Sequence, residues 1–125
     1  MEKSINILLV EDEPVAARLN SEHLKKSGYN VIQAFSGAQA VTEAYNNLNR
    51  LDLILMDIKM PEMNGLDATR AIRLQKPSQF IIAVTAFALS DDRNRALDAG
   101  CDDYISKPIT QMKLFEKIGR FLPVE

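Results

Sequence analysis

The sequence predicts an α/β fold in which five parallel strands form a doubly wound sheet with helices on both faces. Short apolar runs alternate with longer amphipathic stretches along all 125 residues, which is the pattern of consecutive βαβ units. The runs are apolar nearly throughout, as expected for strands whose two faces are both covered by helices. Right-handed crossovers join such units, and ligands of doubly wound sheets bind beyond the carboxyl ends of the strands.

The predicted strands are the five apolar runs at residues 5–10, 30–34, 52–57, 80–85 and 103–107. The first two helices have clear boundary signals. Pro14 suits the first position of the first helix, and Gly28 closes that helix. Ser36 with Gln39 three residues later is the capping-box pattern, which predicts the start of the second helix.

The other three helices are predicted from apolar faces and capping residues. The third ends at Lys76-Pro77, and its partial apolar face consists of Leu66, Ala71, Ile72 and Leu74. The fourth begins at Ser90, where two following aspartates favour the helix dipole, and it stops at Gly100. Thr110 caps the fifth, whose periodicity predicts one apolar stripe made of Leu114, Phe115, Ile118 and Leu122.

Length and composition indicate one domain, residues 1–125, with a core at about residues 4–122. A net charge of -2 offers no electrostatic attraction to nucleic acid or to an anionic membrane. No apolar run is long enough to cross a bilayer, and the N-terminus lacks the apolar segment of a signal peptide. The lone Cys101 excludes an internal disulfide and a cysteine-only zinc site. We therefore expect a cytoplasmic protein that binds neither nucleic acid nor membrane directly.

Five polar residues stand at the carboxyl ends of the predicted strands: Glu11, Asp12, Asp57, Thr85 and Lys107. Because the carboxyl ends of parallel strands share one edge of the sheet, we expect these side chains to lie close together. Three carboxylates, a hydroxyl and an amine collected there form a candidate site for a metal ion and a phosphoryl group.

The three carboxylates indicate a cation. Two carboxylates about 4 Å apart repel by roughly 4 kcal/mol at an effective dielectric of about 20, so three at one edge are costly without a positive ion. All-oxygen ligands favour a hard ion, Mg²⁺ first and Mn²⁺ as the alternative. A purely structural role stays open, in which Glu11, Asp12 and Glu13 only cap the first helix. That role does not account for Asp57, which precedes a loop.

Asp57 is the candidate nucleophile, because a carboxylate can attack phosphorus and form an aspartyl phosphate. Such a transfer needs in-line geometry and neutralised charge on the phosphoryl oxygens. A metal held by Asp12 and Asp57 can bind one oxygen, Lys107 a second, and Thr85 a third. Pro108 permits a cis peptide bond after Lys107, which is compatible with a lysine aimed back over the strand ends.

This arrangement resembles the receiver domain of two-component response regulators. The resemblance rests on Glu11-Asp12, Asp57, Thr85 and Lys107-Pro108, and on the stretches at residues 8–13, 56–65 and 99–108. It covers essentially the whole chain and every strand end. It implies the flavodoxin-like receiver fold with strand order 2-1-3-4-5, in a stand-alone protein or in a piece of a hybrid histidine kinase or larger regulator.

The resemblance also implies a role for each site residue. Asp57 would accept a phosphoryl group from a phosphohistidine on a histidine kinase or a histidine phosphotransfer protein. The implied Mg²⁺ ligands are Asp12, Asp57 and the backbone carbonyl of Lys59, with Glu11 acting mainly through water. The implied phosphate-binding residues are Thr85, Ala86 and Lys107. The protein would then be a signalling phosphoacceptor, with self-catalysed phosphorylation and slow autodephosphorylation as its only chemistry.

Switching and phosphate lifetime are implied in the same way. Thr85 would move toward the new phosphate and Tyr104 would turn inward behind it, which would change the surface of the fourth helix, fifth strand and fifth helix for a downstream protein or a linked effector domain. Lys59, Ala86 and Phe87 occupy positions that influence how water reaches the acyl phosphate. The bulky and basic pair Lys59 and Phe87 predicts slow hydrolysis.

Three alternatives compete with this interpretation. An aspartyl-phosphate phosphatase of the haloacid dehalogenase type would carry a second Asp where this chain has Lys59, and it would need a longer chain for its cap. In a flavin-binding module of similar topology, Glu11-Asp12-Glu13 would repel the phosphate of the flavin. A receiver fold that has lost phosphorylation is disfavoured because the required side chains are present.

The remaining candidate residues are interpreted structurally. His23 is expected on a helix face, and Cys101 is expected to be a small packed residue without a redox role. Basic residues of the last two helices are expected to form a solvated face, although it coincides with the implied signalling surface: Arg93, Arg95, Lys113, Lys117 and Arg120.

Overall fold

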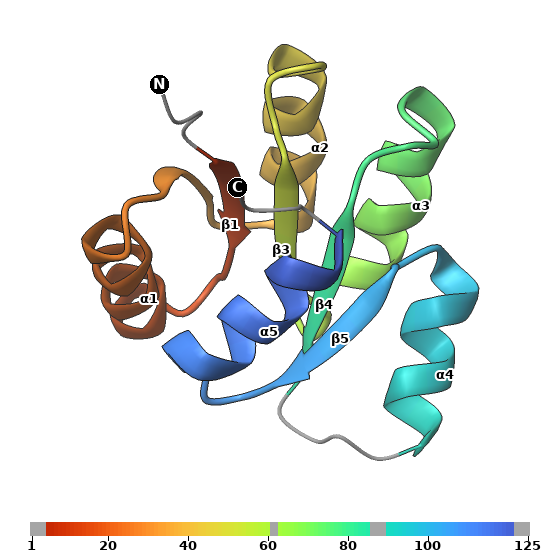
Figure 1. Cartoon of the computed structure of the whole chain (residues 1–125). Coiled ribbons are helices and arrows are strands. Elements are labelled where there is room, and N and C mark those ends of the chain that lie inside the picture. Colours follow the sequence, from red (N-terminus) through yellow and green to blue (C-terminus); the bar gives the residue numbers. More distant parts are fainter. Residues whose placement is uncertain (1–4, 61–62, 86–89, 122–125) are drawn as a thin grey trace.

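The computed structural model describes residues 5–60, 63–85 and 90–121, which form one sheet with helices on both sides (Figure 1). The strands are β1 (Asn6–Val10), β2 (Asn30–Ala34), β3 (Leu53–Asp57), β4 (Ile81–Thr85) and β5 (Asp103–Ser106). The helices are α1 (Pro14–Lys26), α2 (Gly37–Asn46), α3 (Gly65–Gln75), α4 (Ser90–Ala99) and α5 (Gln111–Phe121). The ten predicted elements are therefore all present, each within one or two residues of its predicted place.

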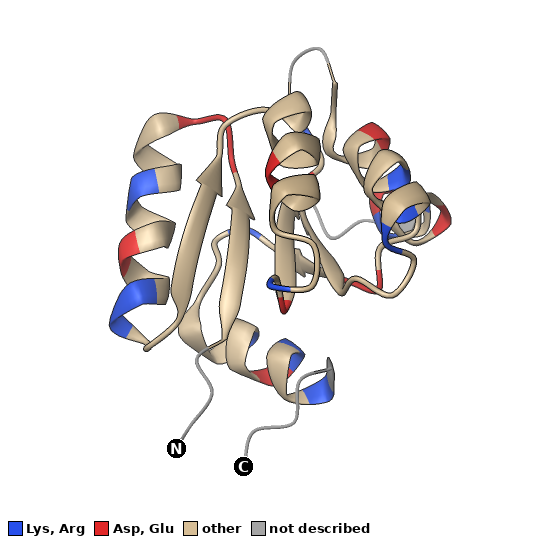
Figure 2. Cartoon of the chain, turned by 90° about the horizontal axis from the view of Figure 1, so that it is seen from above, with Lys and Arg blue, Asp and Glu red and all other residues tan. Residues whose placement is uncertain are grey.

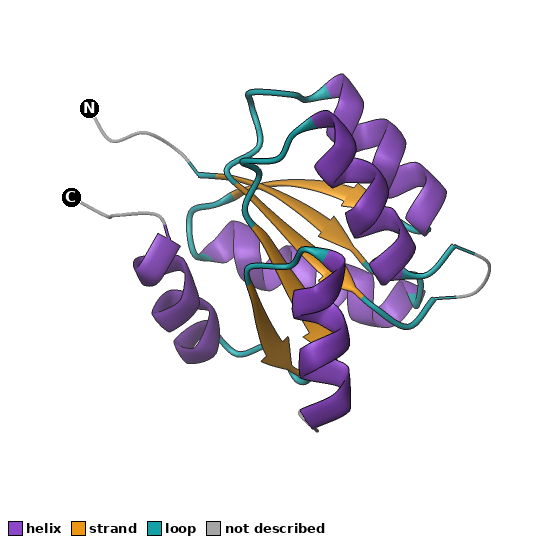
Figure 3. Ribbon diagram, turned by 90° about the vertical axis from the view of Figure 1, so that its right-hand side faces the viewer, coloured by secondary structure: helices purple, strands orange, loops and turns teal. Residues whose placement is uncertain are grey.

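All neighbouring strands are parallel, and their order is β2-β1-β3-β4-β5. The predicted doubly wound topology and strand order are confirmed. Figure 3 shows the sheet between two layers of helices. Chain order reverses between β1 and β3, where the crossovers go to opposite sides of the sheet, and at such a point ligands bind in sheets of this kind.

Two hydrophobic clusters, one on each face of the sheet, make up the core. One cluster joins β1, β3 and β4 to buried residues of α2, α3 and α4, and the other joins alternate residues of the same strands to α1 and α5. Leu8 and Ile54 belong to the first cluster, whereas their chain neighbours Leu9 and Leu55 belong to the second. Successive strand residues point to opposite faces, so nearly every residue of a central strand must be apolar.

The predicted helix boundaries follow from local hydrogen bonds. Glu13 caps α1, because its carboxylate accepts from the backbone N–H groups of Val15 and Ala16. Ser36 caps α2 through the N–H of Gln39, while the Gln39 side chain accepts from the N–H of Phe35. The N-caps of α3 and α5 are side chains of Asn64 and Thr110. Gly28 and Gly100 have positive φ angles of 93° and 112°, a conformation that favours glycine after a helix.

Two residues predicted for apolar helix faces are exposed instead. The Leu74 side chain of α3 is 87% exposed, and Phe115 of α5 is 56% exposed. Leu74 follows the buried Ile72 by two positions, which places it about 200° around the helix on the solvent side. Ala71 is half-buried, while Ala68 and Thr69 complete the buried face. Leu114 and Ile118 form the buried stripe of α5, and Leu122 lies outside the described residues.

Arg73 ties together the loops at the amino-terminal edge of the sheet. Its guanidinium pairs with Asp102 (Nη2–Oδ2 2.8 Å), whose carboxylate also accepts from the N–H of Ile81 at 2.8 Å. The same guanidinium donates to three backbone carbonyls, those of Gly100, Pro77 and Gln79. We call this group the Arg73 clasp, and it fixes the entry points of β4 and β5 relative to the C-terminal part of α3.

Asn6 joins the start of β1 to the loops and strands beside it through hydrogen bonds. Its backbone N–H donates to the Asp52 carboxylate at 2.8 Å, and its side-chain amide donates to the carbonyl of Arg50 at 2.9 Å. The side-chain oxygen of Asn6 accepts from the Asn30 amide at 2.9 Å. The amino-terminal edge is therefore joined by side chains across the starts of β1, β2 and β3.

Among the described residues, no helix is both long enough and apolar enough to cross a membrane.

Candidate functional site

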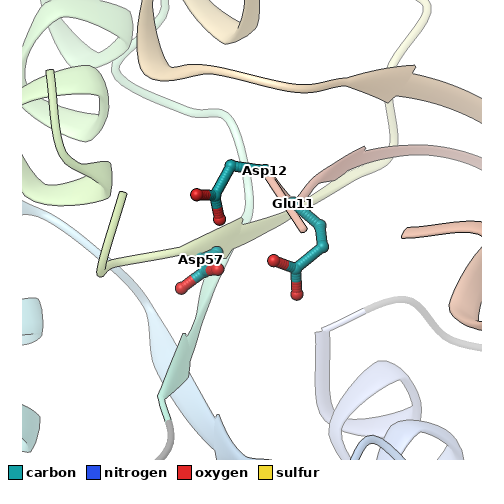
Figure 4. A group of neighbouring side chains, drawn as sticks. All are labelled: Glu11, Asp12 and Asp57. Atoms are coloured by element: carbon teal, nitrogen blue, oxygen red, sulfur yellow. The ribbon is translucent and has the colours of Figure 1, made fainter. Parts of the chain in front are cut away.

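Three carboxylates meet at the carboxyl edge of the sheet, as the strand ends predicted. Glu11 and Asp12 directly follow β1, and Asp57 is the last residue of the neighbouring β3. One oxygen from each of the three lies within 4.8 Å of the others. Figure 4 shows the three carboxyl groups turned toward a shared space. In Figure 2 the acidic segment appears red where β1 leads into α1.

The carboxylate of Asp57 is buried and fixed on both of its oxygens. Only 3% of the residue is exposed. Oδ1 accepts from the backbone N–H of Lys59 at 3.0 Å, and Oδ2 accepts from the ammonium of Lys107 at 3.3 Å. Gly65 begins α3 so close to the Asp57 carbonyl that a Cβ there would collide with it. Close packing of the α3 start therefore supports the position of this carboxylate.

Lys107 lies between two of the three acids. Its Nζ is 3.3 Å from Oε1 of Glu11 and 3.3 Å from Oδ2 of Asp57. The lysine follows β5, and its backbone N–H donates to the carbonyl of Thr85 at 2.7 Å. The Lys107-Pro108 peptide bond is cis. The predicted approach of the lysine to the carboxylates is thus present.

Burial and the neighbouring carboxylates shift the pKa values of Glu11 and Lys107. Burial raises the pKa of the Glu11 carboxyl, and a hydrogen bond and charge repulsion from Asp57 raise it further. Burial alone would lower the pKa of Lys107, but the charges of Asp57 and Glu11 outweigh it and leave that pKa raised. Three carboxylates and one ammonium leave a net negative charge in a mostly buried place, which is an environment that a divalent cation stabilises.

The donor set fits a hard cation. All three side-chain groups supply oxygen, no histidine or cysteine joins them within the described group, and Asp12 is half-buried, so the cluster remains accessible. Mg²⁺ prefers such a site, with one or two carboxylates and several waters. Glu13 is the N-cap of α1, as the purely structural role of the acidic residues predicted. Glu11 does not share that capping role. Instead, the Glu11 carboxylate accepts from the N–H of Glu13 and pairs with Lys107.

Thr85 has a partner that the sequence did not indicate. The residue is 2% exposed at the end of β4, and its hydroxyl donates to Oδ2 of Asp92 in the first turn of α4 at 3.2 Å. We expected Asp92 only to favour the helix dipole. A carboxylate seven residues after a strand-end hydroxyl, on the first turn of the next helix, is a weak signal because the contact depends on where the helix packs.

Tyr104 is half-buried in β5 beneath two cations. The guanidinium carbon of Arg93 in α4 lies 5.4 Å from the centroid of its ring, and Nζ of Lys117 in α5 lies 5.2 Å from it. Tyr104 therefore contacts both helices that flank β5.

The other residues considered in the sequence analysis differ in burial and in distance from the site. The Lys59 residue is exposed beside Asp57. Ala86 and Phe87 lie outside the described residues. His23 is exposed, and Cys101 is buried with its sulfur 3.6 Å from the Thr69 hydroxyl, as expected of a helix-face residue and a packed thiol.

The basic face expected on the last two helices is only partly solvated. Lys117 and Arg120 pair with Asp103, at 3.1 and 3.7 Å. Lys113 donates to the carbonyls of Ser106 and Pro108. Several of these cations therefore hold β5 to α5 instead of facing solvent freely.

Comparison with known proteins agrees with this site. The family model of the response regulator receiver domain matches residues 7–119. The polar-differentiation response regulator DivK of Brucella ovis is 38% identical over 119 residues, which are 94% of this chain and 95% of DivK.

Solved structures give the same result. The receiver domain of the sensor histidine kinase PA1611 from Pseudomonas aeruginosa, which has a magnesium ion coordinated in its active-site cleft, is 40% identical with a TM-score of 0.85, over 95% of this chain and 98% of that one. The co-crystal structure of the Saccharomyces cerevisiae phosphotransfer protein Ypd1 and the receiver domain of Ssk1 contains a chain with a TM-score of 0.86 and 28% identity, over 97% and 90%. These comparisons lend no support to the phosphatase alternative.

Proposed function

The chain belongs to the response regulator receiver domain family, and we propose that Asp57 is its phosphoacceptor. The observation that carries this proposal is the buried Asp57 carboxylate, with the Lys107 ammonium 3.3 Å away and two further carboxylates beside it. A nucleophile, a fixed positive charge and a place for a metal ion are the requirements of phosphoryl transfer to a carboxylate.

The transfer forms one bond and breaks another. An oxygen of Asp57 attacks the phosphorus of a phosphohistidine, the P–N bond breaks, and its electron pair stays on the imidazole nitrogen, which takes up a proton. Lys107 donates to one phosphoryl oxygen, and Thr85 turns its hydroxyl from Asp92 toward another. Ala86, which lies outside the described residues, is the third phosphate-binding residue of this proposal. Fixed donors of this kind stabilise the charge that spreads over the phosphoryl oxygens.

The cluster of oxygen donors supports the metal ligands that we propose. Asp12, Asp57 and the backbone carbonyl of Lys59 would hold Mg²⁺, for which Mn²⁺ could substitute, and Glu11 would act mainly through water. When bound, the ion neutralises the negative charge of the carboxylates and of the incoming phosphoryl group. Burial and, after it, the neighbouring Asp57 raise the pKa of Glu11, and a bound cation would offset both costs of its negative charge.

The donor is a histidine kinase or a histidine phosphotransfer protein, a class of partner that the Ypd1–Ssk1 complex contains. Exposed apolar side chains of α1, Val15 at 68% and Leu19 at 56%, stand near the edge where Asp57 lies and suit a protein partner. After phosphorylation, movement of Thr85 and Tyr104 changes the surface of α4, β5 and α5 for a downstream protein or a linked effector domain. The protein acts in the cytoplasm, without direct contact to nucleic acid or membrane.

The chain phosphorylates itself from such donors and loses the phosphate slowly. Turnover would require a second acidic group to activate water, and the corresponding position holds Lys59. The side chains of Lys59 and Phe87, with the small Ala86 between Thr85 and Phe87, set the access of water to the acyl phosphate. A bulky and basic pair slows hydrolysis.

Incubation with MgCl₂ and acetyl phosphate, followed by intact-protein mass spectrometry, tests the proposal. We expect a gain of one phosphoryl mass that is lost in Asp57→Asn and abolished by EDTA. Asp98→Asn, which removes an exposed carboxylate of α4 and changes the net charge equally, is expected to gain the mass as the parent does. No adduct on the parent, or an adduct on Asp57→Asn, would refute the proposal, and steady hydrolysis of p-nitrophenyl phosphate would favour a phosphatase.

A further inference from the structure

The hydroxyl of Thr85 already has a charged acceptor on α4. It donates to Oδ2 of Asp92 at 3.2 Å, and Asp92 is half-buried in the first turn of α4. A hydrogen bond to a charged group is stronger than one between neutral groups. This contact therefore biases the orientation of the Thr85 side chain before any phosphoryl group is present.

The backbone of Thr85 is not free to follow a second acceptor. Its carbonyl accepts from the N–H of Lys107 at 2.7 Å, and the residue pairs with Ser106 across β4 and β5. Asp57 pairs with Val84 on the other side of β4. The Thr85 hydroxyl can therefore reach a second acceptor only by rotation of its side chain. A threonine hydroxyl has one hydrogen, so a full hydrogen bond to Asp92 competes with one to a phosphoryl oxygen.

We propose that Asp92 is a positioning residue, which acts through Thr85 and holds its hydroxyl on the α4 side of the sheet until Asp57 is phosphorylated. The proposal rests on the proposed function, since it concerns the same phosphoryl group. A ligand that uses the released hydroxyl must first break the Asp92 hydrogen bond, so its apparent affinity is lower than its affinity for the released form. Asp92 thus sets the threshold of the switch.

The neighbouring residue connects the same helical turn to Tyr104. Arg93 lies over the Tyr104 ring, with its guanidinium carbon 5.4 Å from the centroid. Two consecutive residues of α4 therefore contact Thr85 and Tyr104, one each. When the Thr85 hydroxyl leaves Asp92, the first turn of α4 loses a hydrogen bond to β4. The contact between Arg93 and the Tyr104 ring can then change. Asp92 and Arg93 together provide a direct physical link between the two side chains.

The test measures the affinity for fluoroberyllate with Mg²⁺, a stable mimic of a phosphoryl group, by NMR titration of the backbone amide signals. We expect Asp92→Ala to bind about three- to tenfold more tightly than the parent, because a hydrogen bond to a charged, partly solvated acceptor is removed from the free state. Asp92→Asn keeps an oxygen acceptor without its charge and should fall between the two. Asp91→Ala is the matched control, since it removes the adjacent, exposed carboxylate of the same helical turn.

A double-mutant cycle separates action through Thr85 from a general effect on α4. Thr85→Val keeps the volume of the side chain and removes the hydroxyl, so Asp92→Ala in this background should leave the affinity unchanged. The proposal is overturned if Asp92→Ala tightens binding equally in both backgrounds, if it has no effect in the parent, or if Asp91→Ala has the same effect. Failure of the parent to bind fluoroberyllate, or equal binding by Asp57→Asn, would instead refute the proposed function and this inference with it.

Discussion

Replacing Glu11 by Gln should stabilise the metal-free protein at neutral pH, although it removes an ion pair. Glu11 is 3% exposed, and its carboxylate is one of three in the cluster. Gln keeps the shape and an oxygen that accepts hydrogen bonds, but it carries no charge. The substitution therefore isolates the cost of the buried negative charge.

The magnitude follows from the distances. The carboxylate oxygens lie within 4.8 Å of one another, and at that limit the repulsion between two of them is about 3.5 kcal/mol at an effective dielectric of about 20. Glu11 has two such partners, Asp12 and Asp57, and one attraction to Lys107 at 3.3 Å, which is about 5 kcal/mol at the same dielectric. The repulsions exceed the attraction by about 2 kcal/mol, and solvent around the half-buried Asp12 and Lys107 reduces the difference. We expect Glu11→Gln to raise the free energy of unfolding by about 1 kcal/mol.

The effect should depend on pH in a direction set by the pKa of Glu11. Burial, with the neighbouring Asp57, raises that pKa above the ordinary value of 4.5. In the parent, stability is then lost as the pH rises from 4.5 through the raised folded-state pKa, because the folded state resists ionisation. The difference between Glu11→Gln and the parent should be present at pH 7 and absent below pH 4.5, where Glu11 is protonated in both states.

Urea unfolding in EDTA at pH 7 and pH 4, followed by circular dichroism, measures these free energies. Glu22→Gln is the matched control, since it removes the same charge from an exposed i,i+4 pair with Arg18 and should change stability by less than about 0.5 kcal/mol. With MgCl₂ the parent should gain more stability than Glu11→Gln. A destabilised Glu11→Gln at pH 7 in EDTA would refute the reasoning, because the attraction of Lys107 would then exceed the cost of the acidic cluster.

Three further predictions concern other parts of the molecule. Val15→Asp should slow phosphoryl transfer from a phosphotransfer protein at least tenfold but leave labelling by acetyl phosphate unchanged. Leu74→Asp, at an exposed residue near the opposite end of the sheet, should change neither rate. Equal slowing by both variants would contradict a donor surface on α1. Arg73→Gln removes the Arg73 clasp and should lower the free energy of unfolding in urea by about 2–4 kcal/mol. A decrease below about 0.5 kcal/mol would mean that the hydrogen bonds of the clasp contribute little to stability. The double variant Lys59→Asn, Phe87→Glu should lose its phosphoryl group faster than the parent, as followed by intact mass after donor removal, and an unchanged rate would exclude a role for this pair.

The carboxylate cluster was predictable because strand ends are a topological property. Once the apolar runs are strands of one parallel sheet, Glu11, Asp57 and Lys107 must share an edge, whatever the details of packing. Their distances then follow from the order of the strands. The shared edge required only periodicity and chain order, whereas the strand order was implied by the resemblance to receiver domains.

The partners of Thr85 and Arg73 could not be predicted in the same way. The Thr85–Asp92 hydrogen bond depends on where the first turn of α4 packs against the end of β4. The Arg73 clasp depends on where two loops meet, the one before β4 and the one before β5. Both are results of tertiary packing, which no local pattern encodes. Leu74 and Phe115 were predicted to lie on apolar helix faces but are exposed, because an apolar residue near such a face can still face solvent.

Side chains close the amino-terminal edge of the sheet, and this has a practical consequence for measurements on the molecule. The amide hydrogens of Asn6 and Ile81 are held by the carboxylates of Asp52 and Asp102, so they are protected where strand ends usually fray. Exchange of these amides with solvent deuterium requires the side-chain hydrogen bonds of this edge to open. Their exchange rates therefore report the free energy of opening of the amino-terminal edge, which can be compared with local changes at the carboxyl edge in the same spectrum.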